Sequence, residues 1–205
     1  YIMNNYQGFN KIELSASDPI DLFCNWFEEA KLKEINDPDA MALATVDRNN
    51  TPNIRMVLVK KIDHGLVFFT NKDSQKGSEI ALNKNAALCF HWKSIRKQVR
   101  FRGPVSIIKA EESDEYFHTR PRGSRIGAIV SKQSSTLKSQ QQFADEYKSF
   151  EESMQGKEII RPDYWVGYRL EPVEVEFWLN SEFRLHQRMR FSKINKNWER
   201  EFLYP

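Results

Sequence analysis

Basic side chains alternate with apolar ones along residues 183–191, a pattern that a strand would sort onto two faces. One face would carry Arg184, His186, Arg188 and Arg190, and the other Phe183, Leu185, Met189 and Phe191. Cations on one face repel each other unless water or an anion neutralises them, and arginine offers paired donors to phosphate. The segment predicts either a solvated outer face, favoured roughly two to one for a generic basic strand, or an anion-binding wall.

A second candidate site combines a phenol, a guanidinium and a hydroxyl. Tyr116, Arg120 and Ser124 are spaced four residues apart, so a continuous helix would place them on one face. These are the donors that a phosphate monoester needs, and Ser124 would lie near a helix N-terminus, where free amides favour anions. Pro121 interrupts the register, so an ordinary amphipathic helix is about equally favoured on spacing alone.

Arg55 and Lys60 lie on one predicted strand, where strict alternation puts them on opposite faces and toward different ligands, unless one is structural. Thr70 and the helix start at Ser74-Gln75-Lys76 offer hydroxyls, a lysine and unpaired amides, which together predict another anion site. Uncharged hydrogen-bonding groups follow at Gln98, Gln133, Ser134 and Ser135. Trp178 offers a flat aromatic ring, or is instead an ordinary half-buried tryptophan of a sheet.

Several common sites are absent from the sequence. The eight glycines include no G-x-G pair, there is no phosphate-binding P-loop, and the four histidines are too scattered to predict a metal site. Gly123-Ser124-Arg125-Ile126-Gly127 lacks the serine position of a nucleophile elbow. Two phosphate-sized cationic sites without a metal motif or nucleophile predict a protein that holds two phosphorylated small molecules, with an organic cofactor supplying the chemistry.

The 205 residues favour a single domain spanning 1–205, in which 1–17 would be a flexible N-terminal segment. With 31 basic and 28 acidic residues, a net charge of +3 does not predict a nucleic-acid partner. No apolar run is long enough to span a membrane. Cys24 and Cys89 lie among apolar neighbours, which favours reduced, buried thiols and a cytoplasmic location.

The elements that must position these residues are mostly short strands. Asp18-Pro19 begins an amphipathic helix that we expect to end near Asn36, and Gly103-Pro104 marks a bulge or bend in a long strand. Strands are predicted at 41–47, 54–61, 66–70, 86–92, 98–108, 173–179, 183–191 and 198–203. Further helices are predicted at 74–83, 111–120, 124–131 and 137–154. This order predicts an α+β fold, a partly closed antiparallel β-barrel with peripheral helices.

A series of motifs resembles a known family along the chain from about residue 18 to the final proline. They are Arg55-Met-Val-Leu-Val-Lys60, Phe69-Thr70-Asn71, Ser74-Gln-Lys76, Lys97-Gln98-Val99, Tyr116-Phe-x-x-Arg120-Pro-Arg-x-Ser124-x-Ile-Gly127, Val130-Ser-x-Gln133-Ser134-Ser135, Glu176-Phe-Trp178 and Arg184-Leu-His186-x-Arg188. Together these segments resemble the pyridoxine/pyridoxamine 5′-phosphate oxidases. The resemblance implies a Greek-key-like split β-barrel that binds FMN between the subunits of a homodimer.

The resemblance also implies a reaction and a set of roles. The reaction is FMN-dependent oxidation of pyridoxamine or pyridoxine 5′-phosphate to pyridoxal 5′-phosphate, with dioxygen reduced to hydrogen peroxide. The implied FMN contacts are Arg55, Met56, Val57, Leu58, Val59, Lys60, Phe69, Thr70, Gln75, Lys76, Gln98, Gln133, Ser134, Trp178 and Arg188. The implied substrate contacts are Lys60, Tyr116, Arg120, Ser124, Arg184 and His186, of which Arg184 and His186 would be catalytic beside the pyridine ring.

Some positions depart from the family pattern. Gln75 replaces an arginine expected at the FMN phosphate, Gln187 replaces an aspartate, and Asn4-Asn5-Tyr6 lacks the basic residues of a substrate-covering segment. Two other functions remain as alternatives. One is a non-catalytic flavin or pyridoxal-phosphate carrier on the same barrel, and the other is a nucleic-acid-binding barrel that uses Arg184, Arg188 and exposed aromatic residues.

Overall fold

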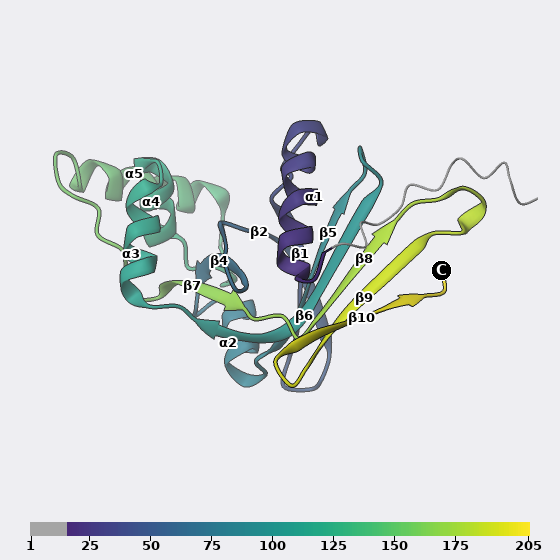
Figure 1. The fold of residues 1–205 in the computed structure, drawn as a ribbon. Helices are drawn as coiled ribbons and strands as arrows, with labels where there is room; N and C mark the ends of the chain where they lie inside the picture. The colour runs from purple at the N-terminus through teal and green to yellow at the C-terminus, as the bar shows by residue number, and fades with distance from the viewer. Residues whose placement is uncertain (1–15) are drawn as a thin grey trace, which may run out of the picture.

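The computed structural model describes residues 16–205, so the expectations for Asn4-Asn5-Tyr6 and for nearly all of segment 1–17 lie outside the described residues. The first element is helix α1 (Pro19–Lys33), where Asp18 caps the N-terminus by accepting a hydrogen bond from the Ile20 amide at 2.7 Å. The helix ends at Lys33, earlier than predicted, because Glu34 takes an extended backbone conformation. The helix lies against one face of the main sheet (Figure 1), and its buried side chains belong to the main core.

Ten strands form one curled sheet in which every described pairing is antiparallel. The main part has the strand order β10-β9-β8-β6-β5-β1-β2, and β3, β4 and β7 extend it around β6. The strands are β1 (Ala40–Val46), β2 (Pro52–Leu58), β3 (Lys61–Ile62), β4 (Leu66–Asn71), β5 (Asn85–Trp92), β6 (Lys97–Ile107), β7 (Trp165–Leu170), β8 (Glu174–Leu179), β9 (Gln187–Ile194) and β10 (Asn197–Leu203).

Strand β6 changes partners around Gly103-Pro104, where the sequence predicted a bulge or bend, so that one strand serves two parts of the barrel. Its first half pairs with β5 and β8, and its second half, from Val105, pairs with β7. A Cβ atom at Gly103 would lie 2.0 Å from the backbone oxygen of Glu171, so only glycine permits this close approach. The result is the α+β, mostly antiparallel split β-barrel that the sequence predicts.

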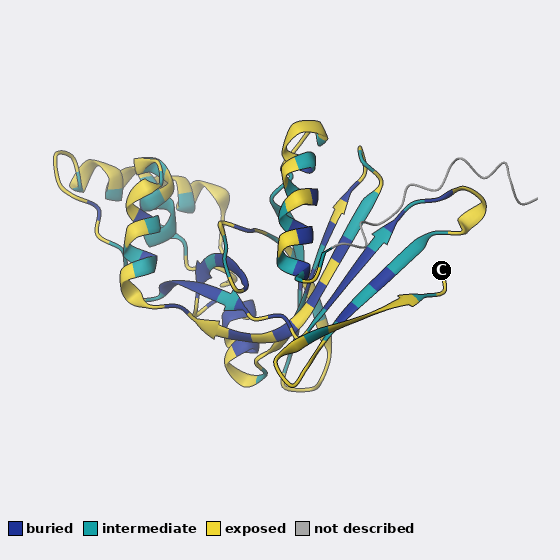
Figure 2. Cartoon of the chain, in the orientation of Figure 1, coloured by how far each residue is buried: buried dark blue, intermediate teal, exposed yellow. Residues whose placement is uncertain are grey.

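Four further helices lie outside the main sheet. They are α2 (Gln75–Leu82), α3 (Ala110–Thr119), α4 (Arg122–Val130) and α5 (Gln140–Ser153). Helices α3 and α4 pack a small second core around Phe117, Ile126, Ile159 and Trp165. Helix α5 contributes no fully buried residue, and Figure 2 shows it largely exposed at the edge of the molecule. No helix of the described residues is long and apolar enough to cross a membrane.

Three details differ from the sequence-based predictions. Strand β7 was not predicted, and Cys24 and Cys89 are free but only half-buried. The predicted strand 183–191 begins only at Gln187, because β8 ends at Leu179, which pairs directly with Gln187. Residues 180–186 must therefore connect the two strands, and they include the short 3₁₀ turn η1 (Glu182–Arg184).

The arrangement of side chains in the predicted strand 183–191 is therefore only partly right. Phe183 is 77% exposed and Leu185 47% exposed, whereas Met189 and Phe191 are buried. Only the second half of the predicted apolar face reaches the core. Arg184 lies in the connection and points from a turn, not from a strand face.

Candidate functional site

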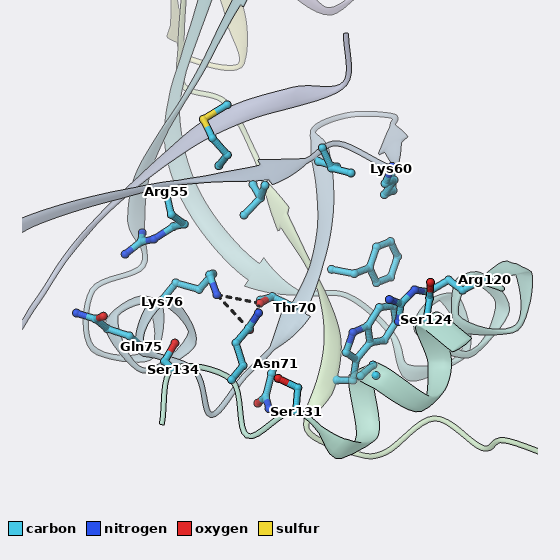
Figure 3. A pocket seen from close by; sticks show the side chains of 18 of the residues that line it. Arg55, Lys60, Thr70, Asn71, Gln75, Lys76, Arg120, Ser124, Ser131 and Ser134 are labelled. Atoms are coloured by element: carbon cyan, nitrogen blue, oxygen red, sulfur yellow. Dashed lines mark hydrogen bonds between the residues drawn. The ribbon is translucent and has the colours of Figure 1, made fainter. Parts of the chain in front are cut away.

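A pocket of about 880 Å³ opens beside edge strand β2, between β4 and helices α2, α3 and α4. It brings together most of the residues singled out by the sequence: Arg55, Met56, Val57, Leu58, Lys60, Phe69, Thr70, Gln75, Lys76, Tyr116, Arg120, Ser124, Gln133 and Ser134. Figure 3 shows two separated groups of polar side chains. We call them the α2 end (Arg55, Gln75, Lys76, Ser134) and the α3 end (Lys60, Arg120, Ser124). Tyr116 also lines the pocket and is counted with the α3 end, because it lies one turn before Arg120.

At the α2 end, Lys76 is a buried lysine held only by neutral oxygens. Its Nζ lies 3.2 Å from Thr70 Oγ1, 3.2 Å from Ser74 Oγ and 3.1 Å from Gln133 Oε1. Among the described residues it has no carboxylate partner within ion-pair distance. Burial, reinforced by the nearby charge of Arg55, lowers the pKa of Lys76. A buried cation that is surrounded by neutral oxygens beside a helix N-terminus is a site for an anion.

Arg55 supplies the other cation of the α2 end and is anchored by a carboxylate of its own. Its Nη2 donates to Glu79 Oε2 at 3.0 Å, and its Nη1 donates to Leu43 O and Thr45 Oγ1. Glu79 is 4% exposed and also accepts hydrogen bonds from Thr45 and Asn53. Burial alone would raise the pKa of the Glu79 carboxyl, but these donors together hold it below its ordinary value.

At the α3 end, the guanidinium of Arg120 is buried against aromatic rings. It lies 4.8 Å from the centroid of Trp165, and its Nη1 is a buried donor without a hydrogen-bond partner among the described residues. Burial lowers the pKa of Arg120. Tyr116, one turn earlier on α3, stacks on Phe69 with ring centroids 4.1 Å apart. An unpaired buried guanidinium beside a phenol and the hydroxyl of Ser124 fits a second anion.

Lys60 differs from Arg120 because it already has an acidic partner. The chain leaves β2 at Leu58, and the Lys60 amide donates to Val67 O at 2.8 Å, which fixes the backbone at the pocket. Its Nζ lies 2.6 Å from Asp39 Oδ2. Val59, which the resemblance placed among the FMN contacts, is 4% exposed and does not line the pocket. Its side chain faces the core.

Five of the singled-out residues lie elsewhere, on the side of the sheet beyond β5: Gln98, Trp178, Arg184, His186 and Arg188. Gln98, Trp178 and Arg188 occupy one cross-strand register of β6, β8 and β9, which we call the β8 row. His186 lies against Trp178 at 4.6 Å, and its Nδ1 faces the Ser181 amide at 3.2 Å. Within one chain these residues are separated from the pocket.

The β8 row lies on the face of the sheet that points away from the main core. Its neighbours along the strands, Val99, Phe177 and Met189, are fully buried on the opposite face. At the far edge of the sheet, β2 exposes Ile54, Met56 and Leu58 to 68%, 62% and 40%. Exposed apolar side chains at alternate positions of an edge strand indicate a surface that associates with another protein surface.

Sequence reasoning missed part of the pocket lining. Asn53, Ile54, Asn71, Ser131 and Trp165 also line the cavity. The signal for Asn53 was available, because it lies two residues before Arg55 and so shares its face of the strand. Trp165 had no such signal, because β7 itself was not predicted. No group of metal-ligating side chains occurs among the described residues.

The chemistry of the pocket matches an organic, phosphorylated ligand. Two unpaired cations at opposite ends fit two phosphates, and the wall between them carries aromatic and aliphatic side chains of β2, β4 and β7. The donor set at the α2 end, in which the neutral groups of Gln75 and Ser134 accompany Lys76, fits the phosphate of an organic cofactor such as FMN. Gln75 lines the pocket and offers an uncharged amide where the resemblance implied an arginine.

Solved structures define the class to which this fold belongs. The chain superposes on PhzG from Burkholderia lata 383, solved with tetrahydrophenazine-1-carboxylic acid, with a TM-score of 0.90 and 29% identity over 96% of this chain and 97% of that one. An FMN-binding protein from Nostoc punctiforme, at 15% identity, has the same fold with a TM-score of 0.76 over 93% of this chain and 100% of that one. This chain therefore shares the split β-barrel architecture of both proteins.

Sequence comparisons define the family within this class. Residues 27–153 match the model of pyridoxamine 5′-phosphate oxidase, and residues 165–205 match the pyridoxine 5′-phosphate oxidase C-terminal dimerisation region. Pyridoxine/pyridoxamine 5′-phosphate oxidases of Sinorhizobium fredii and Rhizobium meliloti are 51% and 50% identical over 93% of this chain and 94% of theirs. The chain belongs to the pyridoxamine 5′-phosphate oxidase family.

Proposed function

We propose that this protein is an FMN-dependent oxidase that converts pyridoxamine 5′-phosphate or pyridoxine 5′-phosphate to pyridoxal 5′-phosphate. The observation that carries the proposal is the pair of cations without carboxylate partners among the described residues, Lys76 and Arg120, at opposite ends of one pocket. One end suits the phosphate of FMN and the other the phosphate of the substrate. The names of the relatives support the same reaction.

Bound FMN would accept two electrons from substrate C4′ and pass them to dioxygen, giving hydrogen peroxide. The amine substrate then requires one water and releases ammonia, whereas the alcohol substrate requires no water. The chain's own residues act by positioning. Arg120, Tyr116, Ser124 and Lys60 would hold the substrate phosphate, and the rigid β2 and β4 segments would fix the flavin so that C4′ lies against it.

The β8 row enters the proposal through a homodimer. The dimerisation region covers residues 165–205, which include Trp178, Arg184, His186 and Arg188. We propose that these residues and Gln98 complete the pocket of a second copy, with Arg184 and His186 flanking the pyridine ring. The Ser181 amide donates to His186 Nδ1, which leaves Nε2 as the nitrogen available to the substrate. We also propose a single domain in a cytoplasmic enzyme.

The visible spectrum of the purified protein tests the proposal. Anaerobic addition of pyridoxamine 5′-phosphate should bleach the flavin band, and admission of air should restore it with release of peroxide. A yellow protein that neither bleaches nor releases peroxide would instead be a carrier. A colourless protein that binds oligonucleotides in a salt-sensitive manner would support the nucleic-acid alternative.

A further inference from the structure

Lys60, which lines the α3 end of the pocket, forms an ion pair with Asp39, which does not itself line the pocket. Asp39 lies just before β1 and Lys60 just after β2, and the Val59 amide donates to the Asp39 carbonyl at 2.9 Å, which holds the two segments together. The Lys60 Nζ to Asp39 Oδ2 distance is 2.6 Å, and the side chains are 28% and 26% exposed. The pair is therefore close, partly hydrated and placed where a ligand can reach it.

The acidic partners of the two paired cations in the pocket are held very differently. Glu79, the partner of Arg55, is buried and accepts hydrogen bonds from three residues. Asp39 has Lys60 as its single side-chain partner among the described residues. A carboxylate with one partly exposed contact can give up that contact at low cost, whereas a buried, multiply bonded carboxylate cannot.

We propose that Asp39 is a built-in competitor of the substrate phosphate for Lys60, which weakens the binding of phosphorylated ligands at the α3 end. This inference rests on the proposed function, because it assigns that end to the substrate phosphate. A phosphate that approaches Lys60 meets a cation already neutralised and a nearby negative charge. Asp39 thus acts through Lys60 as a specificity-determining residue and not as a catalytic residue.

The competition affects substrate and product alike, because both carry the same phosphate. Weaker binding of the phosphate raises the Michaelis constant and also helps pyridoxal 5′-phosphate to leave. The α2 end is unaffected, since Asp39 has no contact with Lys76 or Arg55 among the described interactions. Asp39 is therefore predicted to affect the affinities of the two ligands differently. It weakens the binding of the phosphorylated substrate and leaves the binding of FMN unchanged.

The test compares the flavin-loaded wild-type protein with Asp39→Asn, which keeps the shape of the side chain and removes its charge. The dissociation constant for pyridoxal 5′-phosphate and the inhibition constant of inorganic phosphate should both fall about three- to tenfold. The Michaelis constant for pyridoxamine 5′-phosphate should fall by a similar factor. The dissociation constant for FMN, measured on the apoprotein by quenching of flavin fluorescence, should change less than about twofold.

A matched control is available one residue along the chain. Lys61 pairs with Glu112 at 2.7 Å, and neither residue lines the pocket. Glu112→Gln should leave all three constants unchanged. Asp39→Ser provides a second variant in case the first folds poorly. A tighter complex is itself informative, because damage to the fold does not improve binding.

Two failures are distinguishable. If Asp39→Asn binds pyridoxal 5′-phosphate no more tightly than the wild type, or more weakly, Asp39 does not compete and instead orients Lys60. If the flavin-loaded wild-type protein itself binds neither pyridoxal 5′-phosphate nor inorganic phosphate, the proposed substrate site is wrong, and the role of Asp39 is overturned with it.

Discussion

The pocket and the β8 row are built in different ways. The pocket gathers residues from β2, β4, α2, α3 and α4 of one chain, and its cations are anchored locally by Glu79, by Thr70 and Gln133, or by Trp165. The β8 row lies on the sheet face that points away from the main core, and none of its three residues lines the pocket. One region is a cavity lined by anchored side chains, and the other is the region that we propose completes the pocket of a second copy.

The anchoring of the cations shows the same contrast. Arg188 of the β8 row also has a buried glutamate, because its Nε donates to Glu176 Oε1 at 2.9 Å. Glu176 is shared with Arg100 on the neighbouring strand. These pairs join neighbouring strands that backbone hydrogen bonds already hold together, whereas the Arg55 pair ties helix α2 to strand β2. Removing a carboxylate should therefore cost more at the pocket than on the exposed sheet face.

Glu79→Ala should produce the largest effect. It leaves Arg55, Thr45 and Asn53 without their shared acceptor in a buried site, so the free energy of unfolding should fall by about 3 kcal/mol. Urea unfolding measures this loss. The control is Glu174→Ala on β8, where the ion pairs span 3.5 and 4.0 Å and the expected loss is below about 1 kcal/mol. Equal losses would remove the contrast between the regions.

Arg120→Ala should have the next largest effect. It removes the unpaired guanidinium of the α3 end, so the Michaelis constant for pyridoxamine 5′-phosphate should rise about 30-fold, as expected for one charge-assisted phosphate contact. Steady-state peroxide release measures it. Arg122→Ala is the control, because Arg122 bonds the backbone oxygens of Met154 and Lys157 outside the pocket. A wild-type Michaelis constant in Arg120→Ala would exclude it from the phosphate site.

Arg184→Ala tests the other region. Arg184 lies in the exposed connection between β8 and β9, and we propose that it flanks the pyridine ring of the substrate. Its loss should therefore lower turnover about tenfold, while FMN binding stays unchanged. Turnover and flavin content are measured on the same preparation. Arg190→Ala, whose guanidinium pairs with Glu201 on β10, is the matched control. Unchanged turnover with full flavin occupancy would contradict the role assigned to Arg184.

Mixed dimers test whether the pocket of one subunit and the β8 row of the other form one site. Suppose that the pocket of one subunit forms one site with the β8 row and Arg184 of the other. A dimer of one Arg120→Ala and one Arg184→Ala subunit then contains one site with both defects and one intact site. Random mixing should then restore about one quarter of wild-type activity. Activity of refolded mixtures measures this. Mixtures no more active than the two variants alone would show that each site is built within a single chain.

The sequence predicted the pocket better than it predicted the connection that carries Arg184. Asp18 and Ser74 indicated where their helices begin, because N-terminal capping is a local interaction. Gly103 indicated an irregular point in β6, because only glycine fits there. The separation of the β8 row from the pocket depends on strand order, which pairs residues distant in the chain. The end of β8 at Leu179 likewise depends on its pairing with β9, and side-chain alternation predicts which residues share a face but not the residue at which pairing begins.

The smallest and most local change in the free energy of unfolding is expected in the connection 180–186. Phe183 has a φ of 54° and is 77% exposed, so its side chain strains the backbone and packs little. Phe183→Gly should therefore raise the free energy of unfolding by about 0.5–1 kcal/mol. Leu185→Gly, two residues later at a φ of −82°, should lower it, because glycine gains nothing there. A loss of stability in both variants would show that Phe183 is held by packing, and the connection would then resemble the rigid pocket more than the exposed row.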